Sequence, residues 1–486
     1  MRAYRADLSA KTSRPPRMAT CCVSAVPLFA FLPALPPVSS PALPEHDPVT
    51  PPSTDIAIGV DFGTTNTVLA VAERGKPVRS VTWPHSGEIE DVYRSVLCFE
   101  RHDIDRILKV ETTGGPYAIE RYLGSVSETR FIQSFKSHIA SAVFRDTRIF
   151  STRFLFEDLL ATFFGLVLDD SGAQVPRGAA IVAGRPVAFA GGNPDEALAH
   201  RRYDAAYAKA GLAKPTYVYE PVGAAYYYAQ RLERDATILV GDFGGGTSDF
   251  SILRFERRNG ALRAIPMGHA GIGIAGDSFD YRIINHVVSP RLGKGSQYRS
   301  MGQAMEVPAH YYANFARWHQ LALLKSADNR RELDKLMRIA LAPELIAKLI
   351  EVIENDWGFA VYRAVSAAKI ALSSQPETLF SFRKGDIIIE DRITAAQFEG
   401  WIADDLSRID ATVDDLLVRE GVKPAAVDRV FLTGGTSYIP AVRNLFARRF
   451  GPEKLDSGGQ FESIAHGLAL IGLEEDRSAW EVMRAA

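Results

Sequence analysis

The sequence has little cysteine, no excess of charge of either sign and no long apolar run. Its 486 residues include only Cys21, Cys22 and Cys98, whose spacing fits neither a disulfide framework nor a zinc site. Its 56 basic and 58 acidic residues nearly cancel, so the net charge does not indicate nucleic-acid binding. No segment is apolar for long enough to span a membrane. We therefore expect a cytoplasmic protein that binds neither nucleic acid nor membrane.

The first 54 residues differ in composition from the rest of the chain. They are rich in Pro, Ser and Ala and show no sustained period, which predicts a disordered N-terminal extension over residues 1–54. The stretch VSAVPLFAFLPAL is similar to the apolar part of a signal peptide, but Pro27, Pro33 and Pro36 interrupt it. The alternatives to a signal peptide are a loose extension and a true start further along the chain, such as Met18.

Strands alternate with helices along the remainder, which predicts an α/β architecture. The polar stretch from about 101 to 125 reads as irregular. We expect two similar α/β lobes around a cleft. The first covers residues 55–238, with a return at about 456–486, and the second covers 239–455, with a helical insertion at about 277–392. The clearest predicted strands are IAIGVDFG, TVLAVAE, GAAIVAG and ATILVGDFG, and the clearest predicted helices are FLFEDLLATFFGLVLDD, DEALAHRRYDAAYAKAGL and SIAHGLALIG.

One phrase occurs twice, as DFGTTNTVLAV at 61–71 and as GDFGGGTSDFSIL at 241–253. Each copy reads as a strand, a tight turn and a second strand. A turn of Gly and Thr lets backbone N–H groups and hydroxyls approach phosphate oxygens. Asp61 and Asp242 head the two copies, and carboxylates that face one another across a cleft suit a hydrated Mg²⁺. The repeat therefore predicts two loops that grip one polyphosphate.

Other nucleotide signatures are weak in this chain. The P-loop pattern is absent, and GKGS at 293–296 is its nearest fragment. Gly271, Gly273 and Gly276 spell G-x-G-x-x-G, but PMGHA precedes them in place of a buried strand. We expect a turn there.

Five motifs together resemble one family. DFGTTNTVLAV and GDFGGGTSDFSIL are similar to the two phosphate motifs of the actin, hexokinase and heat-shock ATPase superfamily, the second in its seventy-kilodalton heat-shock (DnaK-type) form. YEPVGAAYYYA and FESIAHGLALIG resemble the two connecting helices, and FLTGGTSYIPAVRNLF resembles the adenosine motif. The motifs stand in family order over residues 55 to about 475. RFIQSFKSHIAS and the short end of the chain look most like the YegD-like branch of this family.

The resemblance implies a two-lobed actin-like ATPase with duplicated ribonuclease H-like lobes, and it assigns site residues. The catalytic residues would be Lys136, Glu220, Asp242 and Thr247. The nucleotide would bind Asp61, Gly63, Thr64, Thr65, Gly244, Gly245, Gly246, Thr247, Lys369, Ser373, Gly434, Gly435, Thr436 and Tyr438. Asp61, Asp242 and Asp249 would hold Mg²⁺, Asp249 through water. Water would then attack the γ-phosphorus in line, with the charge neutralised by Mg²⁺ and Lys136.

The base pocket departs from the family pattern. Ser366 and Ile370 stand where the family has Glu and Arg, and Tyr438 stands where it has a second Arg. Both arginines that would sandwich the base are thus replaced, so we expect weaker selection of adenine over guanine.

The resemblance implies slow Mg²⁺-dependent ATP hydrolysis by a chaperone, or by a nucleotide switch that works with a client or regulatory protein. The chain ends at Ala486, so we expect no C-terminal peptide-binding domain. Two alternatives remain. A metabolic kinase of the same superfamily would need an acceptor pocket, and an actin-like filament protein would need subunit contacts.

Overall fold

The structure is a computed structural model, and it describes most of the chain from residue 53 to residue 482. It does not describe residues 1–52, 105–106, 126, 177, 192, 259–260, 317–325, 356, 457–461, 479 and 483–486. Nearly all of the predicted extension at 1–54 lies outside the described residues. The residues that the structure describes all belong to one compact unit, Thr50–Ala486. In the described part of the chain, no helix is both long and apolar enough to cross a lipid bilayer.

The first half of this unit contains a sheet in which a hairpin is extended by two parallel strands. Its strand order is β13-β12-β1-β2-β3, and β6 also pairs with β2. β1 and β2 are antiparallel, whereas β12 runs parallel to β1 and β13 runs parallel to β12. The strands are β1 (Ser53–Phe62), β2 (Asn66–Glu73), β3 (Arg79–Ser80), β6 (Tyr93–Arg94), β12 (Ala179–Arg185) and β13 (Thr216–Tyr219).

The second half contains a sheet of the same design. Its order is β16-β15-β14-β21-β22, with β14, β15 and β16 antiparallel and with β21 and β22 parallel to β14. The strands are β14 (Ala236–Phe243), β15 (Ser248–Arg258), β16 (Ala261–Ile272), β21 (Arg429–Thr433) and β22 (Leu455–Asp456). Leaving β6 aside, each sheet has the order third, second, first, fourth, fifth when its own strands are numbered along the chain. This repeated topology confirms the predicted fold class, an α/β protein with duplicated lobes.

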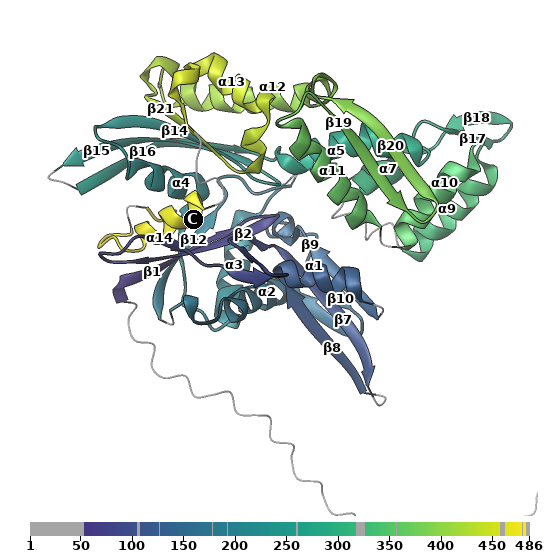
Figure 1. Cartoon of the computed structure of the whole chain (residues 1–486), viewed down its shortest axis with the longest axis horizontal. Coiled ribbons are helices and arrows are strands. Elements are labelled where there is room, and N and C mark those ends of the chain that lie inside the picture. The colour runs from purple at the N-terminus through teal and green to yellow at the C-terminus, as the bar shows by residue number, and fades with distance from the viewer. Residues whose placement is uncertain are drawn as a thin grey trace, which may run out of the picture. The chain divides into compact units, whose positions relative to one another are not determined.

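Two helices lie between the sheets, α4 (Glu220–Ala229) and α14 (Ser463–Ile471) (Figure 1). α14 contacts β1, β2 and β12, and α4 contacts β14 and β15. The two helices also pack on each other at a glycine pair, because a Cβ on Gly467 would lie far inside van der Waals contact of the Gly223 carbonyl oxygen. The shared core includes Val182, Val218, Val222, Ile238, Val240, Leu253, Ile464 and Leu468.

Longer helices cover the outer faces of both sheets. On the first sheet, Phe163 of α2 (Phe156–Ser171) lies 5.5 Å from the ring of Phe62 in β1. On the second, Phe446 of α13 (Pro440–Phe450) lies 5.8 Å from Phe243 in β14. The remaining outer helices are α3 (Glu196–Lys209), which packs on α2, and α12 (Ala395–Arg419), which packs on α13.

The segment predicted to be irregular, from about 101 to 125, is regular instead. β7 (Val96–Ile104) pairs with β8 (Ile107–Gly114) and with β9 (Glu128–Gln133), and α1 (Gly115–Gly124) follows β8. Val96 and Cys98 of β7 form a small core with Ala118 of α1. The other face of β7 packs into the larger core through Leu97 and Phe99. Residues 101–103 and 109–113 of the hairpin are exposed or half-buried, and their sequence therefore looks polar.

The insertion predicted to be helical at about 277–392 contains helices and two hairpins, β17–β18 and β19–β20. Its elements are α5 (Gly276–Ile283), η3 (Ile284–Val288), α6 (Ser289–Arg291), β17 (Gln297–Ser300), β18 (Gln303–Glu306), α7 (Ala309–Ala316), α9 (Ala327–Ile339), α10 (Pro343–Glu354), α11 (Gly358–Leu372), β19 (Glu377–Lys384) and β20 (Ile387–Thr394). The other short elements are β4 (Trp83–His85), β5 (Glu88–Glu90), η1 (Phe135–His138), β10 (Asp146–Ile149), β11 (Thr152–Leu155), η2 (Gly172–Gln174), η5 (Pro424–Ala426), η6 (Gly435–Tyr438) and η7 (Pro452–Lys454).

The G-x-G-x-x-G stretch contains the expected turn, a bend at residues 273–275. Gly271 belongs to β16, and Gly276 begins α5, so a strand and a helix flank the glycines. β16 is nevertheless an edge strand antiparallel to β15. A dinucleotide motif needs a parallel β-α-β unit, which this is not.

Candidate functional site

The first Gly and Thr turn joins β1 to β2. Its glycine is needed because a Cβ on Gly63 would collide with the Asn66 carbonyl oxygen, which accepts a hydrogen bond from the Gly63 N–H at 2.8 Å. Ser95 holds the turn from the side. Its hydroxyl donates to the Gly63 carbonyl at 2.7 Å, and its N–H donates to the Thr65 carbonyl at 2.9 Å. The sequence analysis missed Ser95, because nothing in its neighbourhood marks it.

The second turn joins β14 to β15 in the same way. The Gly244 N–H donates to the Thr247 carbonyl at 3.0 Å, and Asp242 and Asp249 are directly opposite each other in the two strands. The start of α5 adds two more hydrogen bonds, from the N–H of Gly276 to Gly244 at 3.2 Å and from that of Asp277 to Gly245 at 2.8 Å. A helix start therefore supports this turn.

The two turns come from different sheets and lie against each other. A Cβ on Gly245 would lie 2.7 Å from the Thr65 hydroxyl, and one on Gly246 would lie 3.4 Å from the Thr64 hydroxyl. A side chain at Gly245 would therefore collide with the first turn, whereas one at Gly246 would only touch it. The hydroxyls and N–H groups of the two turns are thus brought to one place, as two facing phosphate loops would require.

Three buried carboxyl groups (Glu220, Asp242 and Asp249), the half-buried Asp61 and one ammonium group gather at the strand ends beside these turns. The Lys136 Nζ is 2.7 Å from the Glu220 Oε1, and both side chains are almost fully buried. Burial and then the charge of Glu220 raise the pKa of Asp61 and that of Asp249 to about 7. The same two causes raise the pKa of Asp242 well above its usual value. Burial opposes the charge on Lys136, but Glu220 raises the pKa of that group. One ammonium group is too little positive charge for four carboxylates.

Asp249 also connects the two halves of the chain. Its Oδ1 accepts hydrogen bonds from the N–H groups of Val187 at 2.8 Å and Ala188 at 3.1 Å, just after β12. Its buried Oδ2 makes no hydrogen bond within the described residues. The residues after β12 thereby position an acid of the second sheet, which the sequence analysis did not foresee.

The predicted nucleoside residues lie beyond the second turn. Gly434 has a φ of 83°, and a Cβ there would collide with the Phe243 carbonyl, so glycine is required. The Thr436 hydroxyl is 3.5 Å from the Gly244 carbonyl, and a Cβ on Gly276 would lie 2.9 Å from that hydroxyl. Gly435 begins η6, and Tyr438 ends it with 48% of its surface exposed.

The helix α11 supplies the other predicted nucleoside residues. The Lys369 Nζ forms an ion pair with Asp280 at 2.8 Å and is 3.3 Å from the Gly276 carbonyl. The Ser373 hydroxyl donates to the Lys369 carbonyl at 3.1 Å. Ile370 is 67% exposed. Asp280 was not predicted from the sequence, although an acidic residue near the start of α5 could have indicated a partner for Lys369.

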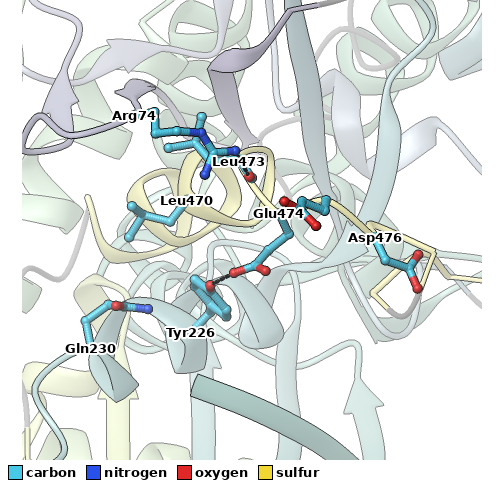
Figure 2. A pocket seen from close by; sticks show the side chains of 8 residues that line it. Arg74, Tyr226, Gln230, Leu470, Leu473, Glu474 and Asp476 are labelled. Atoms are coloured by element: carbon cyan, nitrogen blue, oxygen red, sulfur yellow. Dashed lines mark hydrogen bonds between the residues drawn. The ribbon is translucent and has the colours of Figure 1, made fainter. Parts of the chain in front are cut away.

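The structure thus brings the predicted phosphate and metal residues together from both halves, and it places the predicted nucleoside residues beside the second turn. A pocket elsewhere lies over α4 and the residues after α14 (Figure 2). It is lined by Arg74, Tyr226, Gln230, Leu470, Leu473, Glu474, Glu475 and Asp476. The Tyr226 hydroxyl donates to Glu474 in this pocket. None of the predicted site residues lines it.

Comparison with known proteins adds independent information. A sequence model described as Hsp70 protein matches residues 199–299 and 358–473. These segments include Glu220, the second turn and the predicted nucleoside residues, whereas the first turn and Lys136 lie outside them.

The curated relatives of this chain include several chaperone proteins named DnaK. A chaperone protein DnaK from Thermus thermophilus is 26% identical over 434 residues, which is 85% of this chain and 60% of that protein. A chaperone protein DnaK from Trichormus variabilis is 27% identical over 426 residues, which is 54% of that protein. A chaperone protein dnaK from Gracilaria tenuistipitata is 24% identical over 436 residues, which is 59% of that protein. The chain thus spans between half and three fifths of the length of these relatives.

Proposed function

We propose that this chain is a member of the Hsp70 family, binds ATP with Mg²⁺ between its two lobes and hydrolyses it slowly. The observation that carries the proposal is the pair of facing Gly and Thr turns, supplied by two sheets of the same topology. A polyphosphate between them would receive hydrogen bonds from both. Nearest to it would be the hydroxyls of Thr64, Thr65 and Thr247 and the N–H groups of Gly245 and Gly246.

The acid cluster supports a magnesium site. Lys136 is paired with Glu220, so Asp61, Asp242 and Asp249 are left without a matching positive charge in the described part of the chain. Two buried carboxyl groups and the half-buried Asp61 hold protons or take a cation, and oxygen ligands are what Mg²⁺ prefers. The orphaned Oδ2 of Asp249 is consistent with this. We propose that Asp61, Asp242 and Asp249 hold Mg²⁺, partly through water. When bound, Mg²⁺ would neutralise charge on the phosphates.

The ion pair of Lys136 and Glu220 supports the catalytic assignment. Lys136 would stabilise the charge that develops on the terminal phosphoryl oxygens, and Glu220 would accept a hydrogen bond from the attacking water. The water oxygen would bond to the γ-phosphorus as the bond to the bridging oxygen breaks. The products would be ADP and phosphate. The water oxygen and one of its protons would become part of the phosphate, and its other proton would pass to solvent. Asp242 would hold this arrangement in place from the second sheet.

The chaperone role belongs to the proposal as well. It is supported by the relatives, which are named chaperone proteins. We propose that nucleotide binding and hydrolysis control a client or regulatory protein, in the cytoplasm. The assignment to the YegD-like branch stays a prediction.

Phosphate release without any added acceptor tests this function. The purified chain with Mg·ATP should release phosphate at a slow, steady rate. The Lys136→Ala variant should release it at least about tenfold more slowly while still binding ADP. The exposed lysine Lys214 provides the matched control, because Lys214→Ala should keep the full rate. Release that requires a small-molecule acceptor would indicate a kinase. Undiminished turnover in Lys136→Ala would remove this lysine from the site.

A further inference from the structure

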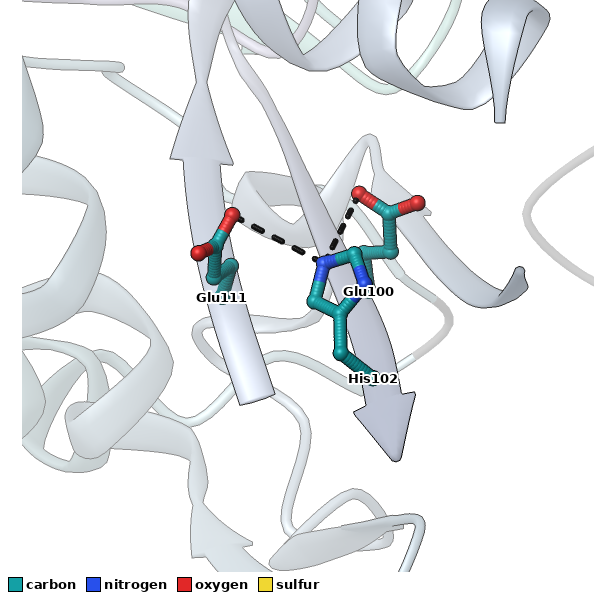
Figure 3. A group of neighbouring side chains, drawn as sticks. All are labelled: Glu100, His102 and Glu111. Atoms are coloured by element: carbon teal, nitrogen blue, oxygen red, sulfur yellow. Dashed lines mark ion pairs between the residues drawn. The ribbon is translucent and has the colours of Figure 1, made fainter. Parts of the chain in front are cut away.

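We propose that Glu100, His102 and Glu111 form a binding site for a divalent transition-metal ion of the zinc class, separate from the proposed nucleotide site. The three side chains belong to the hairpin of β7 and β8 (Figure 3). Nothing in the proposed ATP chemistry uses them.

The backbone forces the two glutamates together. Glu100 and Glu111 are direct partners in the antiparallel pairing of β7 with β8. His102 follows Glu100 by two positions, so its side chain is on the same face of the strand. Two like charges directly opposite each other destabilise a hairpin unless a cation lies between them. The fold therefore creates a place for positive charge.

The distances suit a tetrahedral ion. The His102 Nε2 is 3.3 Å from the Glu100 Oε2 and 3.7 Å from the Glu111 Oε2, and all three ligand atoms lie within 4.8 Å of one another. Zinc bonds to nitrogen and oxygen are about 2.0–2.2 Å long, so ligand atoms around one zinc ion are roughly 3.3–3.6 Å apart. A small inward movement of Glu111 would complete the set. The imidazole favours zinc over Mg²⁺ or Ca²⁺.

Two of the ligand atoms lack hydrogen bonds. The Glu100 side chain is only 5% exposed, and its Oε1 accepts a hydrogen bond from the Ser125 hydroxyl. Its Oε2 and the His102 Nε2 are buried and make no hydrogen bond in the described part of the chain. Both atoms face the point between the three residues.

Two cations of the protein already pair with these glutamates. The Lys109 Nζ is 3.1 Å from the Glu111 Oε1, which leaves the Oε2 of that residue to the proposed site. Arg121 of α1 places NH1 3.0 Å from the Glu100 Oε2 and NH2 3.5 Å from the Glu111 Oε2. Its side chain is 41% exposed, so it can turn into solvent. Arg121 is thus a competitor of the metal: it partly neutralises the glutamates when no metal is bound, and zinc would have to displace it. This makes the site testable, because loss of a ligand and loss of the competitor should have opposite effects.

The experiment is a calorimetric titration of Zn²⁺ into the metal-stripped full chain, in excess Mg²⁺ to occupy sites built only from oxygen. The wild type should bind one zinc ion that His102→Ala and Glu111→Gln each weaken by at least about tenfold, whereas Arg121→Gln should tighten it several-fold. His310→Ala, at an exposed histidine of α7, is the control and should change nothing. Co²⁺ in place of zinc should give a visible absorption band that His102→Ala removes.

Circular dichroism would show whether each variant keeps the fold. A variant that does not fold would be replaced by His102→Gln or Glu100→Gln. No zinc binding by the wild type would overturn the proposal. Equal affinities of His102→Ala and His310→Ala would also overturn it, as would an Arg121→Gln variant that binds zinc no more tightly than the wild type.

Discussion

Tyr438 and Ile370 are the two residues at which, by resemblance, the predicted nucleoside pocket departs from the family pattern. By resemblance both positions would carry arginine, and both side chains are largely exposed here, so each has a surface on which a base could stack. Ile370 offers contact area alone, and Tyr438 adds a π-face. Binding should therefore depend mainly on the phosphates and Mg²⁺.

The prediction is that Tyr438→Ala weakens ATP binding several-fold and pyrophosphate binding much less, and that ATP and GTP bind with similar affinity. Calorimetric titration of ATP, GTP and pyrophosphate against both proteins measures this. A strong preference for ATP that survives Tyr438→Ala would refute the account of the base pocket.

His466 of α14 makes the stability of the protein sensitive to acid. Its Nε2 is 2.8 Å from the Ser80 hydroxyl, and burial lowers its pKa below the usual 6.5. The unfolded chain binds a proton at this histidine below about pH 6.5, whereas the folded chain resists it, so this contribution to stability is lost as the pH falls.

His466→Gln keeps a hydrogen-bonding side chain that does not titrate. The variant should lose less free energy of unfolding than the wild type when the pH falls from 7 to 5, as measured by urea denaturation. His138 and His286, whose pKa values burial also lowers, should leave some acid sensitivity in the variant. Equal losses in the two proteins would show that His466 is not responsible.

At the scale of elements, the strongly patterned segments could be predicted from the sequence. The apolar runs of β1, β14 and β12 and the small-residue run of α14 are where they were expected, because each is buried on both faces and must be almost wholly apolar. The β7–β8 hairpin could not be predicted, since residues 101–103 and 109–113 are exposed or half-buried and show no apolar pattern. Contacts between distant segments were also out of reach. Asp249 with Val187, and Gly276 with Gly244, are set by tertiary packing that no local pattern records.

The crossing of α4 and α14 provides the stability test at this scale. Gly467→Ala should lower the free energy of unfolding by at least about 2 kcal/mol, because its Cβ would collide with the backbone of Gly223 and neither helix can move away from the sheets. Gly165→Ala in α2 is the matched control. A Cβ there would meet nothing within 4 Å, so this change should be neutral or stabilise the helix by up to about 1 kcal/mol. Similar free energies of unfolding for the two variants, from urea denaturation, would disprove the packing argument.

At the scale of the whole molecule, duplication explains the site. Each sheet repeats the order of the other, and each places a Gly and Thr turn after its first strand. A ligand bound by both turns would hold the lobes together, so Mg·ATP should favour a closed arrangement. The central claim is therefore that one nucleotide is bound by both turns at once.

The most direct test is the affinity of Gly245→Ala for Mg·ADP, measured by calorimetry beside Gly400→Ala. A Cβ on Gly245 would lie 2.7 Å from the Thr65 hydroxyl and 3.3 Å from the Asp277 Oδ1, and would push the turns apart, whereas one on Gly400 in α12 would meet nothing within 4 Å. The account predicts at least about tenfold weaker binding, or about 1.4 kcal/mol, for Gly245→Ala and an unchanged affinity for Gly400→Ala. Wild-type affinity in both variants would contradict it.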